Sequence, residues 1–95
     1  MDYSREKDTD AIGDLILEFN VRDLSSMLIF FDSDSYFGFG DLSQAITPIL
    51  ANSTLVMTWL DFPPQVREKG KLIRIYAKRQ LAGTLKTYIN FMESK

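Results

Sequence analysis

The chain has 95 residues, of which 45% are hydrophobic, 25% charged and 13% aromatic, a composition typical of one small globular domain. It contains neither cysteine nor histidine, which excludes disulfide bonds, thiolate or imidazole metal ligands, and catalysis by either side chain. The net charge is −2, but residues 1–41 carry −7 and residues 42–95 carry +5, an asymmetry that either steers a charged partner or averages out if the two parts interleave in space.

The polar residues 1–10 predict a flexible tail, followed by a single globular domain over residues 11–95. No apolar leader is visible, and the longest apolar run, Met27–Phe31, is far too short to span a bilayer, so we expect a cytoplasmic protein. The first part of the domain supports two orders of elements. Residues 14–19 fit a short strand or part of an amphipathic helix. Residues 23–31 fit a capped helix, but the run Met27–Phe31 within them equally fits a buried strand. Strand–helix and helix–strand therefore both stay open.

The rest of the domain alternates between predicted loops, helices and strands. Glycine, serine and aspartate predict a loop over residues 32–40. The elements expected after it are a helix over 41–52 that bends at Pro48, a strand over 54–62, a strand over 72–76 and an amphipathic helix over 79–92. The first of these strands is apolar on both faces, which predicts a central position in the sheet. The fold class that follows is α/β, a small mixed α+β domain with about three helices packed on a short sheet.

Enzyme and metal motifs are absent from the sequence, because no glycine-rich phosphate loop is present and the aspartates near residue 32 lack the spacing of a calcium loop. We therefore expect no cofactor, no metal and no catalysis. Segment 32–41 instead combines aromatic rings with carboxylates, as binding hot spots for a basic protein partner do. The alternative is that the rings fold inward and the aspartates solvate a turn. Trp59, on an apolar strand, is expected in the core. The candidate contact residues are Asp32, Asp34, Tyr36, Phe37, Gly38, Phe39 and Asp41.

Three features resemble the barstar family of small intracellular ribonuclease inhibitors: the loop Tyr36-Phe37-Gly38, a following helix with an early Asp41, and the strand Leu55-Val56-Met57-Thr58-Trp59. The resemblance covers residues 13–62. In that family the loop and the start of the helix plug the nuclease active site. The resemblance therefore implies an inhibitor or immunity-type protein that neutralises a basic nuclease through those loop residues and Asp41. The chain departs from the family at Ala45, where the family has a second acid, and in ending with a predicted helix.

A second resemblance, to winged-helix DNA-binding domains, rests on residues 46–50 as part of a recognition helix and on the strands beginning at residues 55 and 72 as a wing. It implies a transcriptional regulator in which Arg67, Lys69 and Lys71 contact DNA phosphates. The expected recognition helix contains no lysine or arginine and starts with an aspartate, whereas base readout and phosphate anchoring both use cations. The winged-helix function is therefore the alternative to protein binding.

Overall fold

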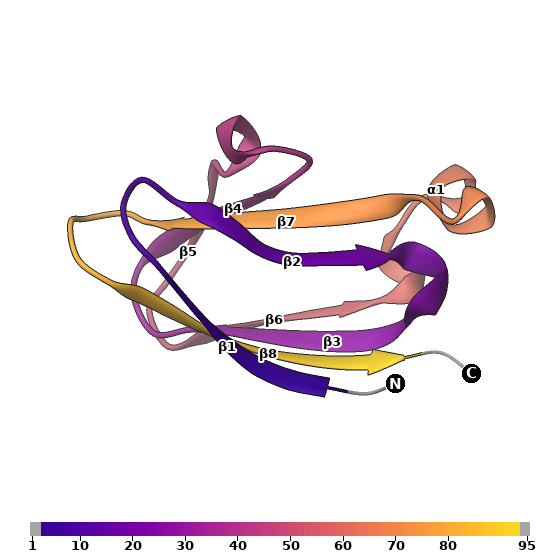
Figure 1. Cartoon of the computed structure of the whole chain (residues 1–95), viewed down its shortest axis with the longest axis horizontal. Coiled ribbons are helices and arrows are strands. Elements are labelled where there is room, and N and C mark those ends of the chain that lie inside the picture. The colour runs from indigo at the N-terminus through magenta and orange to yellow at the C-terminus, as the bar shows by residue number, and fades with distance from the viewer. Residues whose placement is uncertain (1–2, 94–95) are drawn as a thin grey trace.

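The computed structural model describes residues 3–93, apart from the side chains of Tyr3 and Lys69, and consists of two four-stranded sheets packed face to face (Figure 1). The strands are β1 (Tyr3–Thr9), β2 (Asp14–Asn20), β3 (Leu24–Phe31), β4 (Ser35–Phe39), β5 (Thr47–Ile49), β6 (Ser53–Thr58), β7 (Leu72–Arg79) and β8 (Leu85–Glu93). Between them lie the 3₁₀ turns η1 (Val21–Asp23), η2 (Leu42–Gln44) and η3 (Trp59–Asp61) and the helix α1 (Pro64–Lys69). None of the helices within residues 3–93 has the length and apolar character needed to cross a membrane.

The strand order identifies the topology. Sheet A has the order β1-β8-β3-β6 and sheet B the order β2-β7-β4-β5, with antiparallel pairing throughout. This is the order of an eight-stranded jelly roll. Strands make up 58% of the described residues, so the predicted α/β class, with three helices packed on a short sheet, is wrong. Folds of this kind carry many unrelated functions, and the function has to be argued from individual sites.

The largest corrections concern the predicted helices. Residues 41–52 contain only η2 and β5, and residues 79–92 form mainly β8. Residues 23–31, for which a helix and a strand were both left open, form mainly β3. Because β2 precedes β3, neither the strand–helix nor the helix–strand order is observed. The strand predicted over 54–62 exists as β6, but it ends at Thr58 and lies at an edge of sheet A instead of its centre. Residues 3–9, expected in a tail, form the edge strand β1 and pair along their whole length with β8.

The core fills the space between the two sheets and is aromatic at one end. Phe19 from sheet B lies 6.1 Å from Phe62 and 5.5 Å from Phe91 of sheet A, measured between ring centroids. Phe62 in turn contacts Phe39 at 6.2 Å. Burying each such ring contributes about 1.5–3 kcal/mol to stability. Aliphatic side chains fill the remaining interior: Ile16, Leu17, Val21, Leu24, Met27, Ile29, Ile75, Leu85 and Ile89.

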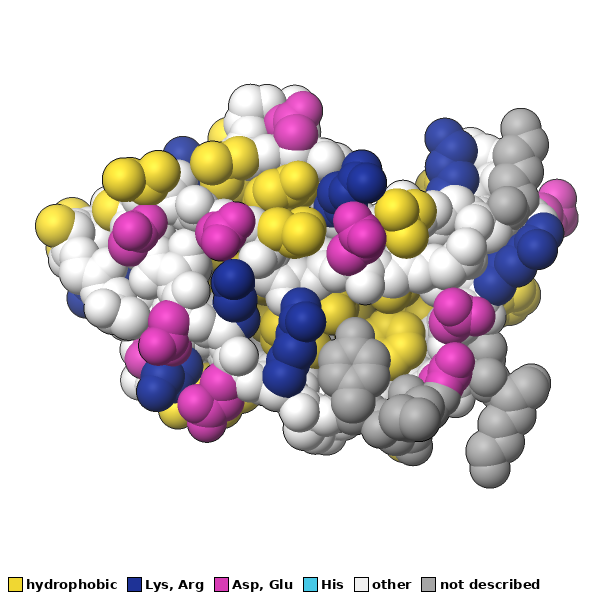
Figure 2. All heavy atoms as spheres, viewed as in Figure 1, with side chains coloured by type: hydrophobic (Ala, Val, Ile, Leu, Met, Phe, Trp, Pro, Cys, Tyr) yellow, Lys and Arg dark blue, Asp and Glu magenta, His cyan; other side chains and the backbone are white. Residues whose placement is uncertain are grey.

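Charged side chains from the acidic and basic parts of the sequence interleave on the surface. Arg74 Nε lies 2.6 Å from Glu18 Oε2, and Lys86 Nζ lies 3.7 Å from Glu6 Oε2. Figure 2 shows acidic and basic side chains interspersed over one face of the molecule. The asymmetry between residues 1–41 and 42–95 is therefore averaged out locally, and we assign it no role in steering a partner.

The edges of β1 and β2 are joined by polar contacts. Lys7 Nζ lies 3.4 Å from Asp14 Oδ2, and the guanidinium of Arg5 donates to the carbonyl of Ile16. The hydrogen bond from the Leu15 N–H, followed by the contact with Lys7, lowers the pKa of Asp14 from its ordinary value. These contacts close one side of the sandwich.

Candidate functional site

The aromatic residues predicted as a contact surface lie within a strand and split between its two faces. Phe37 is 9% exposed and packs in the core, with its ring centroid 6.4 Å from Phe31 and 5.8 Å from Phe39. Gly38 faces outward but is covered by the segment after β4, because a Cβ atom built there would lie 1.7 Å from the carbonyl oxygen of Gln44. The rings of this segment therefore do not form one exposed cluster.

Tyr36 is half-buried on the outer face of sheet B, where Lys78 Nζ lies 5.8 Å from the centroid of its ring. Phe39 is at the margin of the core, partly exposed beside Phe62. Together with Phe37 and Gly38, these residues occupy alternate faces of β4, as the side chains of any strand do. These residues are neighbours in the sequence, but their side chains do not share one surface.

The predicted aspartates hold loops in place. Asp32 Oδ1 accepts a hydrogen bond from the backbone N–H of Lys86 at 2.9 Å, and Asp34 Oδ1 accepts one from the N–H of Ala51 at 2.7 Å. Asp41 lies beyond the other end of β4, where it precedes η2. The carboxylates at residues 32 and 34 thus already serve the fold, and the third is separated from them by the whole of β4.

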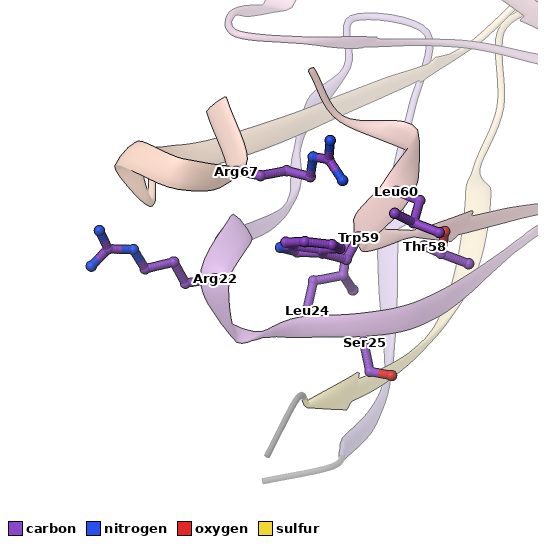
Figure 3. A pocket seen from close by; sticks show the side chains of 7 residues that line it. All are labelled: Arg22, Leu24, Ser25, Thr58, Trp59, Leu60 and Arg67. Atoms are coloured by element: carbon purple, nitrogen blue, oxygen red, sulfur yellow. The ribbon is translucent and has the colours of Figure 1, made fainter. Parts of the chain in front are cut away.

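A different site forms at the end of the sandwich where η1, η3 and α1 meet. Here the surface is hollowed by about 630 Å³ (Figure 3). We call this hollow the Trp59 cleft. It is lined by Arg22, Leu24, Ser25, Thr58, Trp59, Leu60 and Arg67.

The local sequence after β6 explains why Trp59 reaches the surface. Thr58 and Asp61 form a capping box, in which the Thr58 N–H donates to Asp61 Oδ2 at 2.7 Å. This turn takes the chain out of the sheet, and it leaves Trp59 41% and Leu60 71% exposed. Pro64 then starts α1, since a proline at the first helical position sacrifices no hydrogen bond. The helix carries Arg67 back over the turn.

Arg67 and Trp59 form the centre of the cleft. The Arg67 Cζ atom lies 4.5 Å from the centroid of the indole ring, a cation–π arrangement. Figure 3 shows the guanidinium on one side of the ring and Leu24 on the other. Arg67 Nε is buried and has no hydrogen-bond acceptor in the described part of the chain. Arg22 contributes a second cation at the margin, where its guanidinium points away from the indole and donates to the Glu68 carbonyl at 2.9 Å (Figure 3).

This arrangement suits recognition of an anionic group next to an apolar one. The guanidinium is fixed by stacking, and within residues 3–93 no carboxylate forms an ion pair with Arg67. A planar carboxylate matches the fork of N–H donors that a guanidinium presents. Leu60 and the exposed part of the indole supply apolar surface beside that position.

Sequence reasoning missed most of this cleft. It placed Trp59 in the core, and it considered Arg67 only as a DNA contact beside Lys69 and Lys71. Lys69 ends α1 and its side chain lies outside the described atoms, whereas Lys71 is exposed and its carbonyl accepts the N–H of Val21 at 3.0 Å. The signal that identifies the exposed turn is the Thr58-x-x-Asp61 capping box, which is followed after Phe62 by two prolines.

Within residues 3–93 no three side chains of aspartate, glutamate, histidine or cysteine come together as metal ligands. The helix of residues 41–52, on which both family resemblances depend, is replaced by η2 and β5. Comparison with protein-family models, with curated proteins and with solved structures finds no match to this chain.

Proposed function

We propose that this chain is a non-catalytic protein-binding module that docks a carboxylate-bearing segment of its partner in the Trp59 cleft. The observation that carries the proposal is the guanidinium of Arg67, stacked 4.5 Å above an indole that is 41% exposed. Tryptophan and arginine are among the residue types most enriched in binding hot spots, which cluster in well-packed pockets. Stacking also orders the arginine before the partner arrives, which lowers the entropy lost on binding.

Moving the proposed contact from segment 32–41 to the Trp59 cleft reverses the charge expected on the partner, from basic to acidic. A basic partner was predicted because segment 32–41 carries three aspartates, but Asp32 and Asp34 already accept backbone hydrogen bonds from other loops. The charged side chains that line the Trp59 cleft are those of Arg22 and Arg67, so the charge of the cleft is positive. The proposed partner therefore presents a glutamate, an aspartate or a chain-terminal carboxylate next to an apolar side chain.

The remaining parts of the proposal rest on the sequence. A non-catalytic role is supported by the lack of histidine and cysteine, and by the lack of a phosphate-loop or metal-binding motif. A cytoplasmic location stays a prediction. An inhibitory role, in which the partner is an enzyme, is one form that this binding function can take.

The experiment uses the chain's single tryptophan as the reporter. Fluorescence of Trp59 is titrated with capped pentapeptides in which one glutamate is flanked by leucines, and with the same peptides carrying glutamine. We expect the glutamate peptides to bind at least about tenfold more tightly, a difference of about 1.4 kcal/mol. Arg67→Gln should remove this preference, because it removes the charge that distinguishes the two peptides.

The matched control is Lys86→Gln, which removes one positive charge from β8, outside the residues that line the cleft. It should keep the preference for glutamate. Equal affinity of the two peptide series for the unchanged chain, or an equal effect of Arg67→Gln and Lys86→Gln, contradicts the proposed site.

A further inference from the structure

Two of the four sheet edges carry features that prevent strands of other chains from pairing with them. The edge strand β1 carries a run of four charged residues, 5–8, and its Lys7 bridges to Asp14 of β2. The edge strand β2 carries outward acids, Asp14 and Glu18, and its register shifts at a bulge between Leu15 and Leu17. Charges and bulges are the usual devices by which native proteins protect sheet edges.

The other two edges differ from each other. The edge strand β5 has only three residues and contains Pro48, so it too is protected. The edge strand β6 is twice as long, with six residues, Ser53–Thr58, and contains no charge, no proline and no bulge against β3. Thr54 and Val56 are exposed, the latter at 60%. Among the four edges β6 is therefore the one open to further pairing.

The backbone of β6 presents hydrogen-bonding groups at this open edge. In an antiparallel ladder successive residues direct their N–H and C=O groups alternately toward and away from the neighbouring strand. The Thr58 N–H is directed away from β3, since it donates to Asp61 Oδ2. The same alternation turns the backbone groups of Val56 and Thr54 away from β3. No other backbone segment within residues 3–93 pairs with this side of β6.

We propose that β6 pairs antiparallel with β6 of a second copy of this chain, so that the two A sheets join into one sheet of eight strands. A two-fold axis at Leu55 places Val56 opposite Thr54 of the second copy, and the reverse, which satisfies the outward N–H and C=O groups of both residues. The exposed Val56 and its neighbour across the ladder, Leu28, then gain apolar contacts on the outer face of the joined sheet.

The charge pattern favours a second copy of this chain as the partner that pairs with β6. A two-fold interface brings each side chain close to its own equivalent, so a charged strand would meet like charges at the axis. Strand β6 contains no charged side chain, and its Val56 is exposed. This strand can therefore be self-complementary, and the aggregation that an open apolar edge invites is limited by closure into a dimer.

The inference is independent of what the Trp59 cleft binds. The test is sedimentation equilibrium over a wide range of chain concentrations, starting from a monomer mass of 10.9 kDa. We expect a concentration-dependent shift to twice that mass. Val56→Lys and Thr54→Lys should each weaken dimerisation at least about tenfold, because each places two like charges next to the axis.

The matched control is Leu81→Lys, which adds the same charge at an exposed position between β7 and β8. It should leave the dimer unchanged, and circular dichroism should show all three variants folded. A wild-type chain that stays monomeric up to about 1 mM, the range of the weakest specific associations, overturns the proposal. A dimer that both lysine variants at β6 leave intact overturns it equally.

Discussion

Segment 32–41, which contains strand β4, and the turn–helix segment from Thr58 to Arg67 have similar composition but present their aromatic side chains differently. Both combine aromatic rings with charged residues within about ten positions. In β4 the ring of Phe37 is 9% exposed, whereas in the turn–helix segment the ring of Trp59 is 41% exposed and lies under a cation. Composition therefore does not decide which aromatic residues are available for binding.

The difference comes from the hydrogen-bonded neighbours of each segment. β4 pairs with β7 on one side and with β5 on the other, so its side chains must alternate between the core and the outer face. The chain after β6 leaves the sheet through the η3 turn, and no ladder forces Trp59 inward. Phe37, in the paired strand, therefore packs in the core, whereas Trp59, in the capped turn beside the Trp59 cleft, is exposed to a partner.

The sharpest test of this contrast is to delete one ring from each region. Phe37→Ala should lower the free energy of unfolding by about 3–5 kcal/mol, because it leaves a cavity between the sheets. Trp59→Ala should lower it by less than about 1.5 kcal/mol, since much of its ring already contacts solvent. Urea unfolding followed by circular dichroism measures both values. Similar losses for the two variants would mean that Trp59 is a core residue and would remove the contrast.

A second prediction concerns the backbone around Gln44, which packs over Gly38 on the outer face of β4. Gly38→Ala should destabilise the fold by about 3 kcal/mol, because its Cβ would lie 1.7 Å from a backbone oxygen, which no side-chain rotation can relieve. Gly40→Ala is the matched control: no atom lies within 4 Å of its Cβ, and only the positive φ of +101° opposes it, at about 1 kcal/mol. If the two alanines had equal effects in urea unfolding, the segment after β4 would not be packed on it.

Part of the strand content follows from the sequence, whereas the helix predictions fail for identifiable reasons. The strand predicted over 54–62 is present only up to Thr58, the strand predicted over 72–76 lies within β7, and the strand interpretation of 14–19 is the one observed. A bulge between Leu24 and Ser26 separates the inward residues Leu24 and Met27 by three positions, which imitates helical spacing. Bulges are decided by pairing with a distant strand, and a single sequence window does not contain that information.

In β8 the polar Thr87 hides the alternation. Thr87 is fully buried at an inward position, where its hydroxyl donates to the carbonyl of Lys7 at 3.1 Å. The outward positions include Tyr88 and Met92, whose apolar character completes a false helical stripe with Leu85 and Ile89. A polar residue facing in and apolar residues facing out together reverse the pattern from which strands are recognised.

The candidate site could be predicted only in its residue types. The sequence indicates aromatic residues near short connections as candidate anchors, but the choice between Phe37 and Trp59 depends on which strand lies at an edge. β6 is apolar enough to look central, and its edge position follows only from the strand order of sheet A. Burial of one segment is thus set by partners that are remote in sequence.

The smallest change in the free energy of unfolding is expected when one carboxylate is removed from each region. Asp34 Oδ1 accepts the Ala51 N–H and Asp61 Oδ2 accepts the Thr58 N–H, both at 2.7 Å. Replacing either with alanine leaves one exposed N–H to water, so each should lower the free energy of unfolding by only about 1 kcal/mol. In stability the two variants should therefore look alike.

In binding the same two variants should differ, because only Asp61 holds the turn that presents Trp59. Asp61→Ala loosens η3, so acrylamide should quench Trp59 fluorescence more strongly and the glutamate peptides should bind more weakly. Asp34→Ala leaves the Trp59 cleft intact, so neither measurement should change. If Asp34→Ala weakened peptide binding as much as Asp61→Ala, the contact surface would extend to the 32–41 segment and the division between the two regions would fail. A loss confined to Asp61→Ala, at matched stability, places the contact at the turn, where geometry and not composition makes a ring available.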